Sequence, residues 1–224
     1  MAGKHKSTAK QLLIVDDHPM MRTGLGQLID NEPDLVVAAE ADNARQAQEA
    51  VTKQKFDLIL LDISLPDKNG LELIKDLKAL KPDLAILVVS MHDESLYAER
   101  VLRAGARGYI MKQEGGQKLL QAIRHVLAGQ VFVSEKMSAR ILENFSGGPG
   151  QPSGSPVRRL SDREFEVFQM IGQGVATGEI ATRLHLSVKT VEVHRANIKQ
   201  KLKLATATEL VRYAVRWLDA QGPE

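Results

Sequence analysis

The sequence predicts an α/β fold with a doubly wound, parallel, five-stranded sheet, followed by a small all-α domain of four helices. Short apolar runs alternate with amphipathic stretches up to residue 128, whereas residues 157–222 carry helical patterns and no strand signal. Apolar runs without polar alternation are typical of parallel strands that are covered by helices on both faces. Between the two regions, Ser146 to Pro156 reads SGGPGQPSGSP, which is typical of a linker.

Five strand–helix units account for the first region. Each apolar run and the amphipathic stretch after it are, in order, Leu12–Val15 and Met20–Ile29, Leu35–Ala39 and Ala44–Val51, Leu58–Leu61 and Leu71–Leu80, Leu84–Val89 and Leu96–Ala104, Gly108–Met111 and Leu119–Leu127. We assign residues 11–128 to this domain. Residues 129–145 are expected to form one connecting helix with Ser134 as its N-cap, so that 129–156 hold that helix and the linker.

Four helices are expected in the domain at 157–222. Ser161 followed by Glu164 has the spacing of a capping box, which predicts a helix that ends near Gly172. Helices at Thr177–Leu184 and Val188–Leu202 are separated by a short turn, the arrangement of a helix-turn-helix. Thr206–Leu218 completes the set.

Composition excludes several classes of protein and site. The chain has no cysteine, so it has no disulfide scaffold, thiolate zinc site or cysteine nucleophile. No apolar run is long enough to span a bilayer, and we expect a cytoplasmic protein without membrane contact. Residues 11–127 hold 14 Lys and Arg against 18 Asp and Glu, whereas residues 157–224 hold 11 against 8. The basic second region favours a polyanion as its partner.

Polar side chains follow four of the five strands. They are Asp16 and Asp17 after the first strand, Asp62 after the third, Ser90 after the fourth and Lys112 after the fifth. In such sheets the carboxyl ends of the strands form the ligand site, so we expect these side chains to converge. Three close carboxylates repel unless a cation intervenes, and Mg²⁺ is the cation that oxygen ligands favour. Asp62 would then be the nucleophile that accepts a phosphoryl group.

Four segments resemble bacterial response-regulator receiver domains: LLIVDDHPMMRTGL, DLILLDISLPDKNGLEL, ILVVSMHDE and GARGYIMKQE. The resemblance covers residues 11 to about 127 and implies a flavodoxin-like sheet of strand order 2-1-3-4-5. It also implies that Asp62 is the phosphoacceptor, that Asp17, Asp62 and the Ser64 backbone carbonyl bind Mg²⁺ directly, and that Asp16 binds it through water. Ser90 and Tyr109 would form a switch pair, and Lys112 would pair with the phosphate.

Simpler interpretations exist for each residue taken alone. An Asp-Asp pair after a strand is more often a turn or helix cap, and Tyr109 alone would be a half-buried aromatic. His18 has no second ligand-type histidine near it in sequence, so we expect it to be structural or exposed. Gln113 stands where many receivers have proline, so a cis peptide bond after Lys112 is not expected.

The helix at Val188–Leu202 is basic, since residues 189–203 carry five Lys and Arg and one Glu. Val191, Ile198 and Leu202 share a face suited to the core, and the opposite face can enter a major groove. The charge alone would equally suit a solvated helix face. However, the segments RRLSDREFEVFQMIGQG and EIATRLHLSVKTVEVHRANIKQKL resemble the LuxR-type DNA-binding domain, and together the two resemblances indicate the NarL/FixJ group of response regulators.

The resemblance implies a recognition helix that directs Lys189, Thr190, Glu192, Val193, Arg195 and Ala196 toward the bases, with His194 and Lys199 nearer the backbone or scaffold. Glu192 could accept a hydrogen bond from cytosine. The last helix would supply a dimer interface through Leu210, Val211 and Val215, with core packing as the alternative.

We therefore expect a transcriptional regulator that is phosphorylated by a sensor histidine kinase, forms a homodimer and binds double-stranded DNA. One alternative is a DNA-binding regulator that does not depend on phosphorylation. A second is a phosphatase with an aspartyl nucleophile, but Ser64 occupies the position where such enzymes usually carry a second catalytic aspartate, so no enzyme activity on external substrates is expected.

Overall fold

The computed structural model describes residues 9–146 and 156–220, which fall into two compact units divided between Ile141 and Leu142. Most of the predicted linker, residues 147–155, lies outside the described residues. Within the described ranges, no helix combines the length and the apolar character needed to cross a membrane.

The first unit is built on five parallel strands in the order β2-β1-β3-β4-β5, which confirms the flavodoxin-like fold. The strands are β1 (Lys10–Val15), β2 (Leu35–Ala41), β3 (Leu58–Leu61), β4 (Ala85–Ser90) and β5 (Gly108–Met111). Side chains of β1 are buried on both faces, because Leu12 and Leu13 point in opposite directions and neither is exposed. The sheet is therefore covered on two sides, as its unbroken apolar runs predict.

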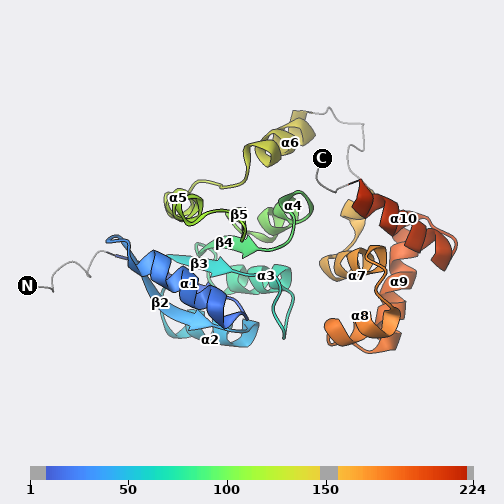
Figure 1. Cartoon of the computed structure of the whole chain (residues 1–224), viewed down its shortest axis with the longest axis horizontal. Coiled ribbons are helices and arrows are strands. Elements are labelled where there is room, and N and C mark those ends of the chain that lie inside the picture. The colour runs from blue at the N-terminus through green and yellow to red at the C-terminus, as the bar shows by residue number, and fades with distance from the viewer. Residues whose placement is uncertain (1–8, 147–155, 221–224) are drawn as a thin grey trace, which may run out of the picture. The chain divides into compact units, whose positions relative to one another are not determined.

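Five helices connect or follow these strands, and Figure 1 shows them alternating with the strands along the chain. They are α1 (Pro19–Asp30), α2 (Ala44–Lys53), α3 (Gly70–Leu80), α4 (Glu94–Ala104) and α5 (Gly116–Leu127). The apolar faces of α1 and α5 form one core with the sheet, through residues such as Leu25, Ile29 and Ile123. Helices α2, α3 and α4 contact one another in series and bury Val51, Leu77 and Val101.

The segment after α5 differs in part from the single helix predicted for 129–145. Phe132 pairs with Gly108 at the outer edge of β5, where Tyr109 N donates to Phe132 O at 2.9 Å and Phe132 N donates to Arg107 O at 3.0 Å. Helix α6 (Glu135–Ser146) begins only after this pairing. Ser134 caps it as predicted, since its Oγ accepts a hydrogen bond from Met137 N at 3.1 Å.

The second unit consists of helices and the turns between them, and no strand occurs among its described residues. A short 3₁₀ turn, η1 (Pro156–Arg159), precedes α7 (Asp162–Gly172), α8 (Thr177–Arg183), α9 (Val188–Leu202) and α10 (Ala207–Asp219). The predicted capping box is present at the start of α7, where Ser161 and Glu164 bond each other's backbone N–H. At its other end α7 approaches α10 closely, because a Cβ at Gly172 would lie 2.8 Å from the Ala214 carbonyl oxygen. Glycine is therefore needed at that contact.

Candidate functional site

The polar residues predicted at the strand ends do converge. The register aligns Val15 of β1 with Leu61 of β3, so that Asp62 N donates to Val15 O at 2.8 Å and the two carboxyl ends lie level. On the other side of β3, strands β4 and β5 pair Ser90 with Met111, which precedes Lys112. The sheet thus gathers three carboxylates, a hydroxyl and an ammonium group at the carboxyl ends of its strands, which we call the acidic edge.

Lys112 lies between two of the carboxylates. Its Nζ is 2.7 Å from Asp16 Oδ2 and 2.6 Å from Asp62 Oδ2, and all three side chains are only 3% exposed. Burial raises the pKa of Asp62 above its ordinary value, and the attraction of Lys112 offsets only part of that effect. Burial opposes the charge on Lys112 as well, but the two carboxylates outweigh it and raise the pKa of the ammonium group.

The peptide bond after Lys112 is trans, as expected from Gln113 in the place of proline, and no peptide bond is cis among the described residues.

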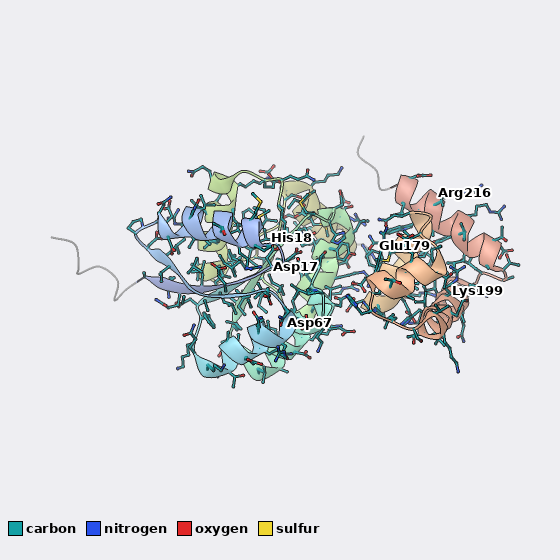
Figure 2. All side chains as sticks on the ribbon, turned by 60° about the horizontal axis from the view of Figure 1, so that its bottom comes forward. Asp17, His18, Asp67, Glu179, Lys199 and Arg216 are labelled. Carbon is teal, nitrogen blue, oxygen red and sulfur yellow. The ribbon has the colours of Figure 1, made fainter. Side chains whose placement is uncertain are left out.

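Asp17 and His18 complete the acidic edge, and Figure 2 shows them next to each other. One ligand atom from each of Asp16, Asp17, His18 and Asp62 lies within 4.8 Å of all the others. Asp17 Oδ1 is shielded from solvent and accepts no hydrogen bond from the described residues, although His18 Nδ1 is 2.7 Å away. A buried oxygen without a donor, beside two further carboxylates, fits a divalent cation.

The loop after β3 is fixed at several points. Ser64 N donates to Asp62 Oδ1 at 3.1 Å, and Ser64 pairs with Asn69 in an isolated antiparallel bridge. Asn69 then caps α3, and Asp67 accepts hydrogen bonds from two backbone N–H groups at the start of α2. The loop therefore holds the backbone of Ser64 beside Asp62, where its carbonyl was predicted to bind the cation.

Ser90 and Tyr109 meet at the turn between β4 and α4. Both are buried, and both bond the backbone of His92: Ser90 Oγ accepts from His92 N at 3.3 Å, and the Tyr109 hydroxyl donates to His92 O at 2.7 Å. His92 Nε2 in turn lies 3.0 Å from Ser64 Oγ. The predicted pair is thus connected to the loop of Asp62 through one residue, His92, that was not singled out in the sequence.

Helix α9 carries the predicted DNA-contacting residues. Val191, Ile198 and Leu202 are buried, as the helical spacing predicts. Among the predicted contacts, Lys189, Glu192 and Val193 are exposed, and Thr190, His194, Arg195 and Lys199 are partly covered. The side chain of Arg195 is only 15% exposed and lies 3.7 Å from Glu192. Lys201 points to the scaffold instead, since its Nζ is 2.6 Å from the buried Glu164.

The predicted dimer residues on α10 have different environments. Leu210 is fully buried, so for this residue the alternative of core packing holds. Val211 and Val215 remain 39% and 36% exposed, and their four-residue spacing places them on one face of the helix. Of the three predicted dimer residues, only the two valines are therefore accessible to another molecule.

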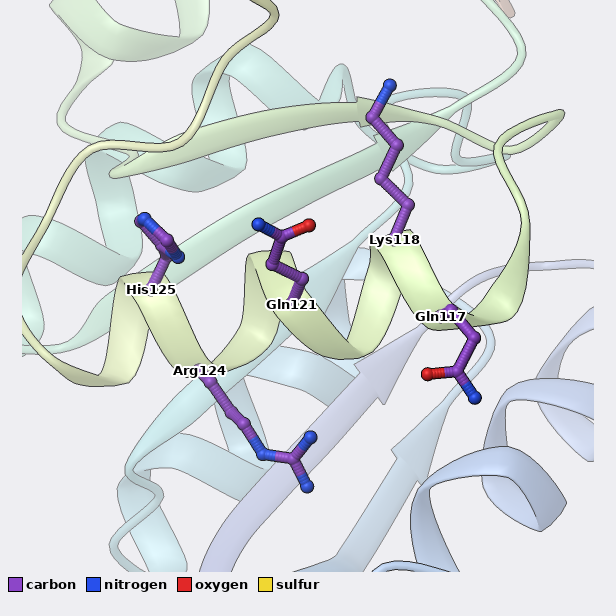
Figure 3. A pocket seen from close by; sticks show the side chains of 5 residues that line it. All are labelled: Gln117, Lys118, Gln121, Arg124 and His125. Carbon is purple, nitrogen blue, oxygen red and sulfur yellow. The ribbon is translucent and has the colours of Figure 1, made fainter.

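A separate shallow pocket lies on α5 and is lined by Gln117, Lys118, Gln121, Arg124 and His125. Figure 3 shows Lys118 and Arg124 extending in opposite directions from the helix. Both cations already have carboxylate partners, Glu114 for Lys118, and Glu32 and Asp34 for Arg124. The pocket offers no converging set of functional groups.

Two family models match the chain, one for each unit. The model described as "Response regulator receiver domain" matches residues 12–124, and the model described as "Bacterial regulatory proteins, luxR family" matches residues 158–214. The oxygen regulatory protein NreC of Staphylococcus carnosus (strain TM300) is 36% identical over 210 residues, which cover 92% of this chain and 97% of NreC.

Solved structures agree with these matches. RcsB from Salmonella enterica serovar Typhimurium, bound to promoter rprA in the presence of the phosphomimetic BeF3-, has a TM-score of 0.63 and 27% identity, covering 92% of this chain and 98% of RcsB. A LuxR-family two-component response regulator from Aurantimonas sp. SI85-9A1 has a TM-score of 0.57 and 32% identity, covering 61% of this chain and 98% of that regulator.

Proposed function

The chain belongs to the NarL/FixJ group of two-component response regulators, in which a receiver domain is joined to a luxR-family domain, and we propose that Asp62 is its phosphoacceptor and α9 its DNA-reading helix. The observation that carries the proposal is the position of Asp62. Its carboxylate is buried at the end of β3, bound to Lys112, and lies among the other carboxylates of the edge.

The proposed reaction is phosphoryl transfer from the phosphohistidine of a sensor kinase. An oxygen of Asp62 attacks the phosphorus, the P–N bond to the donor histidine breaks, and its electron pair remains on the imidazole. Lys112 lies 2.6 Å from the carboxylate and so is placed to pair with negative charge on the transferred group. The kinase, which supplies the donor, is part of the proposal.

We further propose that Asp17, Asp62 and the Ser64 carbonyl hold Mg²⁺, with Asp16 acting through a water molecule. When bound, the ion neutralises charge on the phosphoryl oxygens. Asp17 Oδ1 would gain the partner it lacks among the described residues.

Phosphorylation is then reported through the turn before α4. We propose that the Ser90 hydroxyl rotates toward the phosphate and releases His92 N, and that Tyr109 moves with the turn that it binds. Glu94, two residues later, accepts a hydrogen bond from Ser134 N at 2.7 Å, and Arg140 of α6 contacts Ser95 O at 3.4 Å. A shift of this turn would therefore move the start of α6, which leads toward the second domain.

The output of the proposed switch is DNA binding by a homodimer. Lys199 would contact phosphates, and Lys189, Glu192 and Val193 are the exposed candidates for base contacts. Val211 and Val215 would meet a second copy. Two half-sites about one helical turn apart would then be bound. The solved RcsB complexes with promoter DNA support this proposal by similarity. A DNA target also implies that the protein acts in the cytoplasm.

Phosphotransfer from a small phosphodonor tests the acceptor assignment. Asp62→Asn is expected to abolish labelling, and Asp57→Asn, at the other end of β3, should leave it intact. Robust labelling of Asp62→Asn would overturn the assignment.

DNA affinity with and without beryllofluoride, at one fixed salt concentration, separates a phosphorylation switch from a phosphorylation-independent regulator. We expect beryllofluoride to strengthen binding in the unmodified chain and to have no effect on Asp62→Asn. Equal affinity in all four measurements would favour the independent regulator. Steady multiple turnovers of a small phosphoester would instead favour an enzyme, which the presence of Ser64 in place of a second aspartate argues against.

A further inference from the structure

His18 lies at the acidic edge in a role that its place in the helix does not explain. It is the N-cap residue of α1, yet its side chain makes no capping hydrogen bond. Its backbone N–H donates to Asp16 Oδ1 at 2.9 Å, which fixes the turn, and Pro19 begins the helix. The imidazole instead lies beside the carboxylates, and 66% of the His18 side chain is exposed to solvent.

The separations around this ring are close to those between ligands of one ion. His18 Nδ1 is 2.7 Å from Asp17 Oδ1 and 3.2 Å from Asp16 Oδ1, and an oxygen of Asp62 lies within 4.8 Å of all three. Ligands at roughly 2.1 Å from an octahedral ion are about 3.0 Å apart when adjacent and about 4.2 Å apart when opposite. His18 Nδ1 and the oxygens of Asp17 and Asp62 therefore lie close enough to reach a common centre after a small shift, with Asp16 beside them.

Hydrogen bonding does not account for the shorter contact. His18 Nδ1 is hydrogen-bonded to Asp16 Oδ1 at 3.2 Å, whereas Asp17 Oδ1, although it lies closer to the same nitrogen, accepts no hydrogen bond from the described residues. A shielded carboxylate oxygen without a donor is unfavourable. A cation bound by His18 Nδ1 and Asp17 Oδ1 would replace the hydrogen bond between His18 and Asp16 and would give Asp17 Oδ1 the partner it lacks.

We propose that His18 is a nitrogen ligand of the cation site, and that it makes this site prefer a divalent first-row transition ion such as Mn²⁺ over Mg²⁺. Mg²⁺ favours oxygen ligands and water, whereas an imidazole nitrogen suits transition ions. His92 is the other histidine near this edge, but its Nε2 faces the Ser64 hydroxyl and it does not belong to the four-residue group. The inference rests on the cation site of the proposed function and adds its metal preference.

Calorimetric titration of the full chain with Mn²⁺ and with Mg²⁺ tests the preference. His18→Ala removes the imidazole and no capping bond. We expect it to weaken Mn²⁺ binding on the order of tenfold and to change Mg²⁺ binding less than twofold. His185→Ala, which removes an exposed histidine from the turn between α8 and α9, is the matched control and should change neither.

Pulsed electron paramagnetic resonance of the Mn²⁺-loaded chain gives a second readout that does not depend on affinity. Nitrogen-14 modulation from a directly bound imidazole is expected in the unmodified chain and in His185→Ala, and should be absent from His18→Ala. Modulation that persists in His18→Ala, or equal changes in the affinity for both ions, would overturn the assignment. An increase in both affinities would show that His18 competes with the ion as a positive charge, and would also overturn it. If neither ion binds the unmodified chain, the cation site of the proposed function fails as well.

Discussion

Replacing Asp62 by asparagine should stabilise the receiver domain when no metal is present. The ligand atoms of Asp16, Asp17 and Asp62 lie within 4.8 Å of one another, and two unit charges at that distance repel by about 3 to 4 kcal/mol at an effective dielectric constant near 20. Lys112 cancels part of this repulsion, but the pKa of Asp62 stays raised, so its surroundings disfavour the charge overall. We expect Asp62→Asn to gain about 1 to 2 kcal/mol, or roughly 3 to 8 °C in Tm.

The expected gain depends on pH in a defined direction. A raised folded-state pKa means that the contribution of Asp62 is most favourable below the unfolded value, near 3.9, and is lost as the pH rises through the folded pKa. The difference between the unmodified chain and Asp62→Asn should therefore be largest at neutral pH and vanish in acid. Saturating Mg²⁺ should stabilise the unmodified chain more than the variant, which narrows or reverses the difference.

Asp57 provides the matched control, because the same substitution at the start of β3 should have the opposite sign. Burial opposes the ionisation of Asp57, but hydrogen bonds from Gln11 N and Lys10 outweigh it and lower the pKa. Asp57→Asn should lose about 1 kcal/mol. Calorimetric melting in chelator and in Mg²⁺ measures all three proteins. A lower melting temperature for Asp62→Asn in chelator at pH 7 would refute the electrostatic reasoning.

Three further changes concern the second domain, whose Trp217 is the single tryptophan of the chain and reports its unfolding by fluorescence. Lys201→Gln should destabilise this domain by about 1 to 3 kcal/mol at pH 7. Burial of Glu164 opposes its ionisation, but Lys201 outweighs this effect and holds the pKa of Glu164 below its ordinary value. The loss of stability should therefore disappear as the pH falls through that lowered pKa. A loss that does not depend on pH would contradict the assigned ion pair. Gly172→Ala should lower the stability of this domain by about 1 to 3 kcal/mol, because the added Cβ would lie 2.5 Å from a side-chain carbon of α10. An unchanged unfolding midpoint in urea would show that α7 and α10 move apart without cost. Lys203→Gly should gain about 0.5 to 1 kcal/mol, since Lys203 ends α9 at φ 56°, and a loss would mean that its side chain contributes more than the strain removes.

The fold and the acidic edge could be predicted from the sequence because both follow from local patterns. Apolar runs such as Leu58–Leu61 mark the strands, and in a parallel sheet the residue after each strand must lie at the same edge. Asp62 and Lys112, fifty positions apart, could thus be placed together before any contact was known. The boundaries of α9 were also predicted, because Ser187 is a good N-cap and Leu202 is its last apolar residue.

Features that depend on contacts between distant segments were not predictable in this way. Leu210, Val211 and Val215 all fit the apolar pattern of an amphipathic helix. Leu210 is buried because α7 packs against α10, which the pattern alone does not show. His18 was expected to be structural or exposed, and its side chain is 66% exposed, but its place beside Asp62 was not predictable because Asp62 lies far along the chain. His92 gave no pattern of its own, since it acts mainly through its backbone groups.

The pairing of Phe132 with β5 has a practical consequence for preparing the receiver domain alone. β5 is the last strand of the sheet, and an uncovered edge strand invites pairing with other molecules and aggregation. A fragment that ends at residue 128 would leave this edge open, whereas one that extends through Ser134 keeps Arg107 and Tyr109 bonded to their partner. Gly108 allows that partner to approach, because a Cβ there would lie 2.9 Å from the Phe132 carbonyl oxygen. The residues around Phe132 therefore cover the outer edge of β5 and reduce its exposure to other molecules.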